Sequence, residues 1–288
     1  MNIVIASDIH VSTHHLATLL HEAVTVRASA IIMNGDLVPM SLLRGLSAVE
    51  AIAAHRSYIK ETFLPTIGIY RRQVPDLQIY ADFGNEDFWC NRDVLIEAET
   101  AGLLHLLHNQ VQPLTDGLDI AGYMFVSPTP FMIKDAERLD HHDVPLASDI
   151  RMEGVFTVPN GPEKRRIDSK ETIENDLKGL QQKITRSFLL ATHAPPYGLG
   201  LDVLHDGRPV GSMAIRALIE EEADTGRLVA AFAGHIHDSF ENSGVLATHV
   251  NGCTVVNAGQ RHDLLKYALF DTETRHVAIK TARLMDAK

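Results

Sequence analysis

The sequence predicts an α/β fold in which parallel strands present polar side chains at one edge of a sheet. Short apolar runs alternate along the chain with segments of helical spacing, as is typical of parallel sheets covered by helices. Five of these runs end in residues drawn from Asp, His and Asn. Because the loops at the carboxyl ends of such strands converge, this edge is where α/β sheets bind ligands. We therefore expect a ligand site built from several strand ends.

Each expected element follows from its local pattern, with short apolar runs taken as strands and three-to-four-residue apolar spacing as helices. The expected strands are 2–6, 30–33, 77–81, 118–126, 187–191 and 228–233. The expected helices are 15–28, 46–63, 91–101, 170–183 and 213–223. Towards the C-terminus, alternating apolar and polar residues predict antiparallel strands at 254–257, 266–271 and 275–282.

One long segment lacks any such pattern. Residues 127–169 are rich in Pro, Asp, His and Arg and show no sustained periodicity, so they are expected to form a loop-rich insertion. Neither an internal repeat nor a linker interrupts the rest of the sequence. We therefore expect residues 1–288 to form a single domain.

Composition and charge exclude several classes of protein. Hydrophobic residues make up 45% of the 288 positions, which excludes a disordered, collagen-like or coiled-coil chain. With 26 Lys and Arg against 37 Asp and Glu, the net charge of −11 disfavours a protein that coats nucleic acid. Two cysteines are too few for a disulfide scaffold. The apolar run 2–6 is too short for a signal peptide, and no stretch approaches 18 apolar residues, so a cytoplasmic protein without a membrane partner is expected. A homodimer is compatible with this size.

The polar residues at the strand ends have the chemistry of metal ligands. They are Asp8, His10, Asp36, Asn85, His193, His235 and His237. Imidazole, carboxylate and amide oxygen suit divalent ions such as Mn, Fe, Zn and Co. Seven ligands are too many for one such ion but are enough for two ions that share a carboxylate. Two ions roughly 3.5–4 Å apart can hold a phosphoryl group and activate a water molecule.

The spacing of these residues supports the same interpretation. Asp8 and His10, like His235 and His237, are separated by one residue, which places their side chains on the same side of an extended segment. Glycines at 35, 84 and 234 permit sharp turns and close approach directly after the strands. Any one of these polar residues is more simply explained as a turn or cap residue. That explanation fails for five strand ends in this order.

The complete set resembles the calcineurin-like metallophosphoesterases, whose pattern is Asp-x-His, Gly-Asp, Gly-Asn-His-Asp/Glu, a lone His and Gly-His-x-His. The corresponding segments here are Asp8-Ile9-His10, Gly35-Asp36, Gly84-Asn85, His193 and Gly234-His235-Ile236-His237. The resemblance spans residues 3 to about 259, and Asn257-Ala258-Gly259 is similar to the closing turn of that family.

The resemblance implies a four-layer αββα sandwich, with two mixed sheets flanked by helices, and a centre of two divalent ions. The ions would be Mn, Fe, Zn, Co or Ni, with Mn or Fe favoured. One ion would be held by Asp8, His10, Asp36 and His237. The other would be held by Asp36, Asn85, His193 and His235, so that Asp36 bridges the two.

One position departs from the family pattern. Glu86 stands where the family has the His that protonates the leaving oxygen or stabilises phosphoryl charge. A carboxylate can act as a general acid only if its pKa is raised, which burial or the adjacent Asp87 would do. The expected catalytic residues are therefore His10, Glu86 and Asp87. In the alternative, Glu86 points away and the metals act alone.

Glu86 also bears on the choice of substrate. An ionised carboxylate repels a dianionic phosphomonoester more than a monoanionic phosphodiester, and branches of the family that lack the His resemble phosphodiesterases. A phosphodiesterase that attacks with a metal-bridging hydroxide is therefore favoured, with a nucleotide or another small phosphodiester as substrate. The alternatives are a phosphomonoesterase and a non-catalytic scaffold that binds a protein partner.

The polar loop after His193 is the expected substrate loop, because it resembles one that lies over the site in small prokaryotic phosphoesterases. Its candidate substrate residues are Asp202, His205 and Arg208. It leads to Gly211-Ser212, where the N-terminus of the next helix could bind an anion. Loop structure and capping are the alternative roles for each of these residues.

Overall fold

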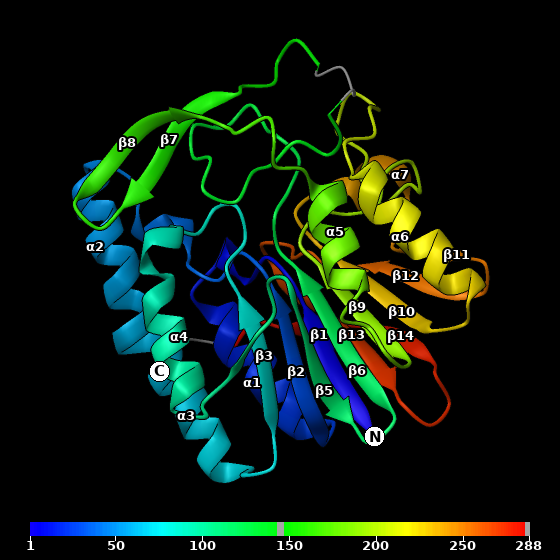
Figure 1. The fold of residues 1–288 in the computed structure, drawn as a ribbon. Coiled ribbons are helices and arrows are strands. Elements are labelled where there is room, and N and C mark those ends of the chain that lie inside the picture. The colour runs from blue at the N-terminus through cyan, green and yellow to red at the C-terminus, as the bar shows by residue number, and fades with distance from the viewer. Residues whose placement is uncertain (143–146, 286–288) are drawn as a thin grey trace.

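The fold is built on two six-stranded mixed sheets packed face to face, as the computed structural model shows for residues 1–142 and 147–285 (Figure 1). The first sheet has the order β14-β13-β1-β2-β3-β4. Its strands are β1 (Asn2–Ala6), β2 (Ala28–Asn34), β3 (Gln78–Asp82), β4 (His105–Leu106), β13 (Leu264–Asp271) and β14 (Val277–Arg283). The second sheet has the order β11-β12-β10-β9-β6-β5. Its strands are β5 (Gln110–Thr115), β6 (Leu118–Tyr123), β9 (Phe188–Thr192), β10 (Leu228–Ala233), β11 (Ala247–Val250) and β12 (Cys253–Asn257).

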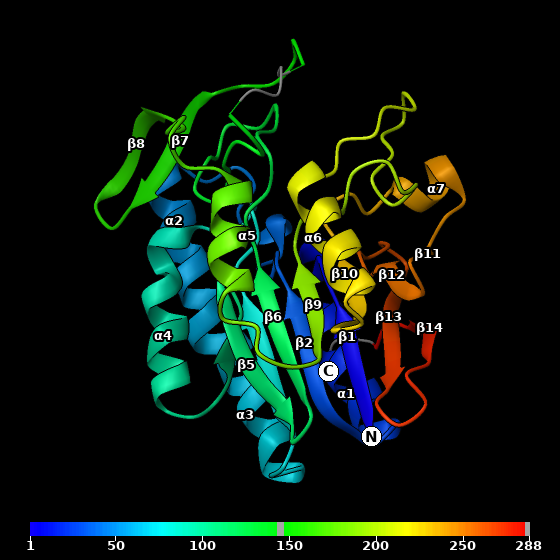
Figure 2. The ribbon, with the colours of Figure 1, turned by 45° about the vertical axis from the view of Figure 1, so that its right-hand side comes forward.

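Helices cover the outer face of each sheet (Figure 2). Those on the first sheet are α1 (His14–Thr25), α2 (Ala48–Tyr58), α3 (Leu64–Gln73) and α4 (Arg92–Thr100). Those on the second are α5 (Ile173–Gln181) and α6 (Met213–Asp224), and the short α7 (Ser239–Ser243) follows β10. Within the described residues, no helix combines the length and the apolar character needed to cross a bilayer.

Three apolar cores hold the four layers together. Alternate residues of β1 point to opposite faces, so Val4 packs against the helices of the first layer while Ile3 and Ile5 pack between the sheets. In β9, Leu190 faces α5 and α6, whereas Leu189 faces the first sheet. Apolar side chains on both faces of these strands explain why each reads as a continuous apolar run. The predicted αββα sandwich is confirmed.

The parallel strands of both sheets end at the same edge. β1, β2 and β3 are parallel and in close register, and so are β6, β9, β10 and β12. The Asn34 amide joins the two sheets there, donating to Thr192 O at 2.6 Å and to Phe232 O at 3.3 Å. The loops that follow these strands are thereby held over one edge.

The structure corrects two of the expected elements. The helix expected to end at residue 63 continues through a π-helical turn, Ile59–Phe63, into α3, and Pro65 lies just after this turn. The strand expected at 254–257 forms as β12, but it pairs parallel to β10 and antiparallel only to β11.

The insertion contains a hairpin that the sequence did not predict. β7 (Glu153–Val158) and β8 (Gly161–Arg166) pair along their whole length. β8 reads Gly-Pro-Glu-Lys-Arg-Arg and is almost entirely exposed, so it shows no alternation of apolar and polar residues. Pairing with β7, rather than a buried face, makes this segment a strand.

Buried polar groups fasten the insertion to the rest of the fold. Lys134 and Glu137 are both buried, and their ion pair of 2.7 Å is completed by hydrogen bonds to Thr129. Asp135 accepts from Trp89 N at 3.0 Å and from Thr157 N at 2.6 Å. The hairpin is thus tied to the segment that follows β3.

A histidine at the base of the insertion makes stability sensitive to acid. The His108 ring lies 4.1 Å from that of Phe125 and 5.0 Å from that of Trp89, and its Nδ1 accepts from Met124 N at 3.1 Å. Burial lowers the pKa of His108 from 6.5 to about 3. The unfolded chain therefore binds this proton first, and the free energy of unfolding should fall as the pH drops from 6.5 towards 3.

The His108→Gln variant keeps an acceptor oxygen but cannot take up the proton. Between pH 7 and pH 5 the unfolding free energy of this variant should fall by about 1–2 kcal/mol less than that of wild type. Urea unfolding of wild type and variant at both pH values measures this difference. Equal losses in the two proteins would contradict the prediction.

Candidate metal centre

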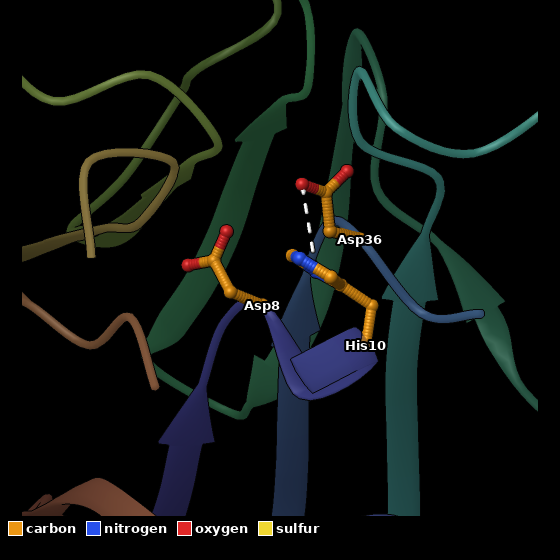
Figure 3. Close-up of side chains that lie close together, drawn as sticks. All are labelled: Asp8, His10 and Asp36. Carbon is orange, nitrogen blue, oxygen red and sulfur yellow. Dashed lines mark ion pairs between the residues drawn. The ribbon is translucent and has the colours of Figure 1, made fainter. Parts of the chain in front are cut away.

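Asp8, His10 and Asp36 form a buried group at the shared sheet edge (Figure 3). Asp8 follows β1, His10 lies in the 3₁₀ turn Ile9–Val11, and Asp36 follows β2. One ligand atom from each lies within 4.8 Å of the others, and His10 Nδ1 is 3.6 Å from Asp36 Oδ2. Such a group of carboxylates and imidazole can hold a divalent ion.

The backbone at the predicted ligands is strained. Asp8, Asp36 and His235 have φ angles of 56°, 53° and 66°, in the left-handed region that L-residues seldom adopt. Neighbouring loops hold this geometry, since Asp8 N donates to Gly35 O at 3.1 Å and the Asp8 carboxylate accepts from His235 N at 3.0 Å. Strain of this kind persists where the surroundings enforce it, and it gathers at functional sites.

The three glycines permit the close approach that the sequence predicted. At Gly84 and Gly234 the reason is lack of space for a side chain and not a positive φ. A Cβ on Gly84 would lie 2.1 Å from Asp36 Oδ1, and one on Gly234 would lie 2.4 Å from Asp8 Oδ2. Gly35 is required on both grounds, because its φ is 110° and a Cβ there would lie 2.3 Å from His193 Nδ1. The carboxylates and the imidazole therefore occupy the space that larger residues would fill.

The remaining predicted ligands join this group. His193 Nε2 lies 2.9 Å from Asn85 Oδ1 and 3.3 Å from Asp36 Oδ2. The His193 ring is 5.3 Å from that of His235. The His10 and His237 rings are 5.6 Å apart. The seven predicted ligands thus lie near one another at this edge, and the Asp36 carboxylate lies between the His10 and His193 imidazoles.

Charge and burial oppose each other in this centre. Burial disfavours an ionised Asp36, yet His193 and His10 hold the pKa of its carboxyl well below its usual range. Burial likewise disfavours a charged His193, but Asp36 raises the pKa of that imidazole to about 9. Burial lowers the pKa of His235 to about 3, with a contribution from His193. The buried Asp36 carboxyl therefore stays ionised only because positive charge lies close to it.

The donor set fits a divalent cation. His10 Nδ1 is buried and has no hydrogen-bond partner among the described residues, which leaves it free to bind a metal ion. His193 Nδ1 lies 3.0 Å from Asn34 O, and a hydrogen bond there leaves Nε2 available on the side of Asp36. Both features are those of imidazoles arranged around a metal ion.

Glu86 faces the centre. Its Oε2 lies 3.3 Å from His10 Nε2, and its backbone N–H donates to Asp36 Oδ1 at 2.9 Å. Burial raises the pKa of Glu86 to about 7, and the largest contribution from a neighbouring charge comes from Asp36, not from Asp87 as the sequence suggested. The carboxylate is still 29% exposed, so substrate can reach it.

Asp87 is placed differently from the catalytic role expected of it. Its carboxylate accepts from the backbone N–H groups of Leu37 at 2.9 Å, Val38 at 3.1 Å and Gly84 at 3.0 Å. In addition, His55 Nε2 lies 3.3 Å from Asp87 Oδ1. This buried carboxylate holds together the loops after β2 and β3, and it therefore positions Asp36 and Asn85.

The predicted substrate residues do not meet the metal group. Asp202 is buried and accepts from Gly198 N and Gly211 N, both at 2.9 Å. Arg208 pairs with Asp206 at 2.7 Å and with Asp149 at 2.9 Å. His205 is exposed. In the described parts of the chain, no hydrogen bond or ion pair joins Asp202, His205 or Arg208 to a predicted metal ligand.

The N-terminus of α6, which was expected to bind an anion, is already occupied by a carboxylate of the protein itself. The Asp140 carboxylate accepts from Met213 N at 2.7 Å and from Ala214 N at 3.2 Å, and it also bonds the Ser212 hydroxyl. The first turn of α6 is therefore capped from within the insertion. This N-terminus is not available to a substrate phosphate.

Two asparagines position the centre, a role that the sequence did not predict, although Asn257 belongs to the expected closing turn. Asn34 connects the two sheets and contacts His193. The Asn257 amide donates to Ile236 O and accepts from Gly259 N, both at 2.9 Å, and so fixes the segment that carries His235 and His237. Their place at the last position of β2 and of β12 was a signal, but amide side chains are also common in turns.

Comparison with known proteins agrees with this geometry. A profile of the calcineurin-like phosphoesterase family matches residues 1–239. No curated protein matches the sequence. Two crystal structures align over 99% of both chains, with TM-scores of 0.61 and 0.59 at 16% and 17% identity, and the second is TT1561 of Thermus thermophilus. At such identities the likeness shows the fold alone.

A dimetal phosphatase from Danio rerio is more distant. It aligns over 93% of this chain and 91% of its own at 9% identity, with a TM-score of 0.49, and adds nothing to the argument from the fold. The family profile covers most of the chain, and the structure supplies a buried Asp-His-Asp group at the expected strand ends. The chain therefore belongs to the calcineurin-like phosphoesterase family and is a metal-dependent phosphoesterase.

Proposed function

We propose that this protein hydrolyses small phosphodiesters at a centre of two divalent ions, with Mn or Fe favoured. The supporting observation is the position of Asp36, whose Oδ2 lies 3.6 Å from His10 Nδ1 and 3.3 Å from His193 Nε2. The first ion would be held by Asp8, His10, Asp36 and His237, and the second by Asp36, Asn85, His193 and His235. The ions would supply a nucleophilic water and neutralise charge on the phosphoryl oxygens.

The chain's own residues prepare this site for an in-line displacement. Asn34 orients His193, Asp87 fixes the loops that carry Asp36 and Asn85, and Asn257 fixes the His235–His237 segment. Such preorganisation places the reacting groups without a cost at the moment of reaction. Glu86, at the open side next to His10, would face the leaving oxygen.

Glu86 is also the residue that supports a diester over a monoester. Its carboxylate stands 3.3 Å from His10 Nε2, where the phosphate of a substrate would approach. When Glu86 is ionised, a monoester brings two negative charges to this carboxylate and a diester brings one, so repulsion discriminates against the monoester. A nucleotide diester is one substrate of this class.

The direct test compares bis-p-nitrophenyl phosphate with p-nitrophenyl phosphate, using wild type and Asp36→Ala with Mn²⁺ added. We expect turnover of the bis-ester well above that of the mono-ester, and loss of both in the variant. A preference for the mono-ester would overturn the phosphodiesterase proposal. Turnover of neither substrate by metal-loaded wild type would favour an enzyme of narrow specificity or the non-catalytic scaffold.

Replacing Glu86 should change the preference without emptying the site. In Glu86→Gln the charge is lost, and in Glu86→His the family's usual residue is restored. Assayed well above pH 7, where Glu86 is ionised, both variants should raise kcat/KM for p-nitrophenyl phosphate relative to the bis-ester by about tenfold, because each removes one carboxylate charge. Glu171→Gln, at an exposed position in the segment before α5, is the control. An unchanged ratio in both Glu86 variants would show that this carboxylate does not select the substrate.

A further inference from the structure

We propose that the insertion carries a docking surface for anionic lipid headgroups at a membrane surface. The surface, named here the hairpin patch, consists of Phe131, Met132, Arg151, Lys164, Arg165 and Arg166. Five of these residues, all but Phe131, line a hollow of about 430 Å³ together with Glu153 and Gly154. This inference does not depend on the proposed hydrolysis.

The charge of the hairpin patch is opposite to that of the protein. Four cations gather here in a chain whose net charge is −11. Arg165 pairs with Glu163, and Arg166 with Glu153 at 3.3 Å. Among the described residues, Arg151 and Lys164 have no carboxylate partner. An anionic surface would repel most of this molecule and attract this part of it.

Two apolar side chains stand beside these cations. Phe131 is 54% exposed and Met132 is 48% exposed, and they are adjacent in the chain. The Arg151 guanidinium reaches Met132 Sδ at 3.1 Å, so the apolar and cationic groups form one surface. Basic residues around an apolar pair are the combination by which peripheral proteins hold to anionic bilayers. A single-stranded nucleic acid would favour several aromatic side chains for stacking, and the patch has one.

The loop that bears the apolar pair is held in place. Lys134 N donates to Val155 O at 2.9 Å and Val155 N to Met132 O at 2.7 Å, so the loop pairs with β7. Gly154 permits this approach, because a Cβ there would lie 2.3 Å from Met132 O. The buried Lys134–Glu137 pair supports the loop from behind. Phe131 and Met132 are thus kept outward on a structured element.

The position of the hairpin suits a surface contact. Figures 1 and 2 show β7 and β8 projecting beside α2, at the end of the molecule toward which the arrows of β6 and β9 point in Figure 2. Asp135 ties β7 to Trp89, shortly after the Glu86 turn. A membrane at the hairpin patch would therefore lie on the same end of the fold as the metal centre.

The test is cosedimentation of the full-length protein with vesicles of phosphatidylcholine alone or with about 30% phosphatidylglycerol, at low and high NaCl. We expect binding only to the anionic vesicles, with loss in high salt. Arg151→Glu/Lys164→Glu should raise the lipid concentration for half-binding at least tenfold, and Phe131→Ser should also weaken binding. Lys60→Glu/Arg72→Glu makes the same change in net charge on exposed residues of the helical segment that includes α3, and should bind as wild type does.

Three results would overturn this inference: no binding to anionic vesicles, equal losses in the two double variants, or no effect of Phe131→Ser. If an oligothymidine binds in a way that needs Arg151 and Lys164 but not Phe131, the surface serves a nucleic acid instead. Circular dichroism confirms that each variant folds. Hydrolysis of a water-soluble ester should be unchanged in all of them, which keeps failure of this inference distinct from failure of the proposed function.

Discussion

Asp36→Asn is expected to lower kcat for bis-p-nitrophenyl phosphate by at least ~10³-fold, the largest effect predicted for this protein. The Asp36 carboxylate contacts both His10 and His193, at 3.6 Å and 3.3 Å, and accepts from Glu86 N. The amide keeps the shape of the side chain but removes the charge that two cations would share. Metal content per chain, measured by mass spectrometry after dialysis, should therefore fall together with the rate.

The control for this variant is Asp76→Asn, an identical change at an exposed aspartate. It should leave both the rate and the metal content as in wild type. Thermal unfolding of both proteins shows whether the Asp36 variant folds, since removing this carboxylate leaves His193 without its charged partner. Full activity with full metal content in Asp36→Asn would rule out a bridging role for this residue.

The metal group could be predicted because its signals are local. Each predicted ligand directly follows a short apolar run, and the runs are apolar on both faces because each strand is buried in two cores. Parallel strands in register then bring distant residues to one edge, so Asp36 and His193 meet although 157 positions separate them. Glycines at the same strand ends strengthened the pattern.

What could not be predicted depends on contacts between segments far apart in the sequence. Asp140 caps α6 across more than 70 residues, so the predicted anion site at Gly211-Ser212 was already filled. The role of Asp87 depends on backbone donors at Leu37 and Val38, which its own neighbours in sequence do not reveal. β8 likewise is a strand because β7 lies beside it.

Gly84→Ala tests whether space, rather than chemistry alone, fixes the metal centre. The backbone of Gly84 does not have a positive φ, so alanine meets no left-handed penalty there. Its Cβ would lie 2.1 Å from Asp36 Oδ1 and 2.5 Å from Asp36 N, and the Asp36 loop must move to admit it. A displacement on the order of 1 Å at a catalytic group can cost ~10²-fold in rate.

We therefore expect Gly84→Ala to lose about 10²-fold in kcat and to bind metal more weakly, although no ligand has been removed. Gly179→Ala is the matched control, because a Cβ at that position in α5 would meet nothing within 4 Å. Titration with Mn²⁺, followed by activity and by calorimetry, separates the two variants. Wild-type affinity and rate in Gly84→Ala would show that the Asp36 loop moves without cost, and that close packing against Gly84 is not what fixes the centre.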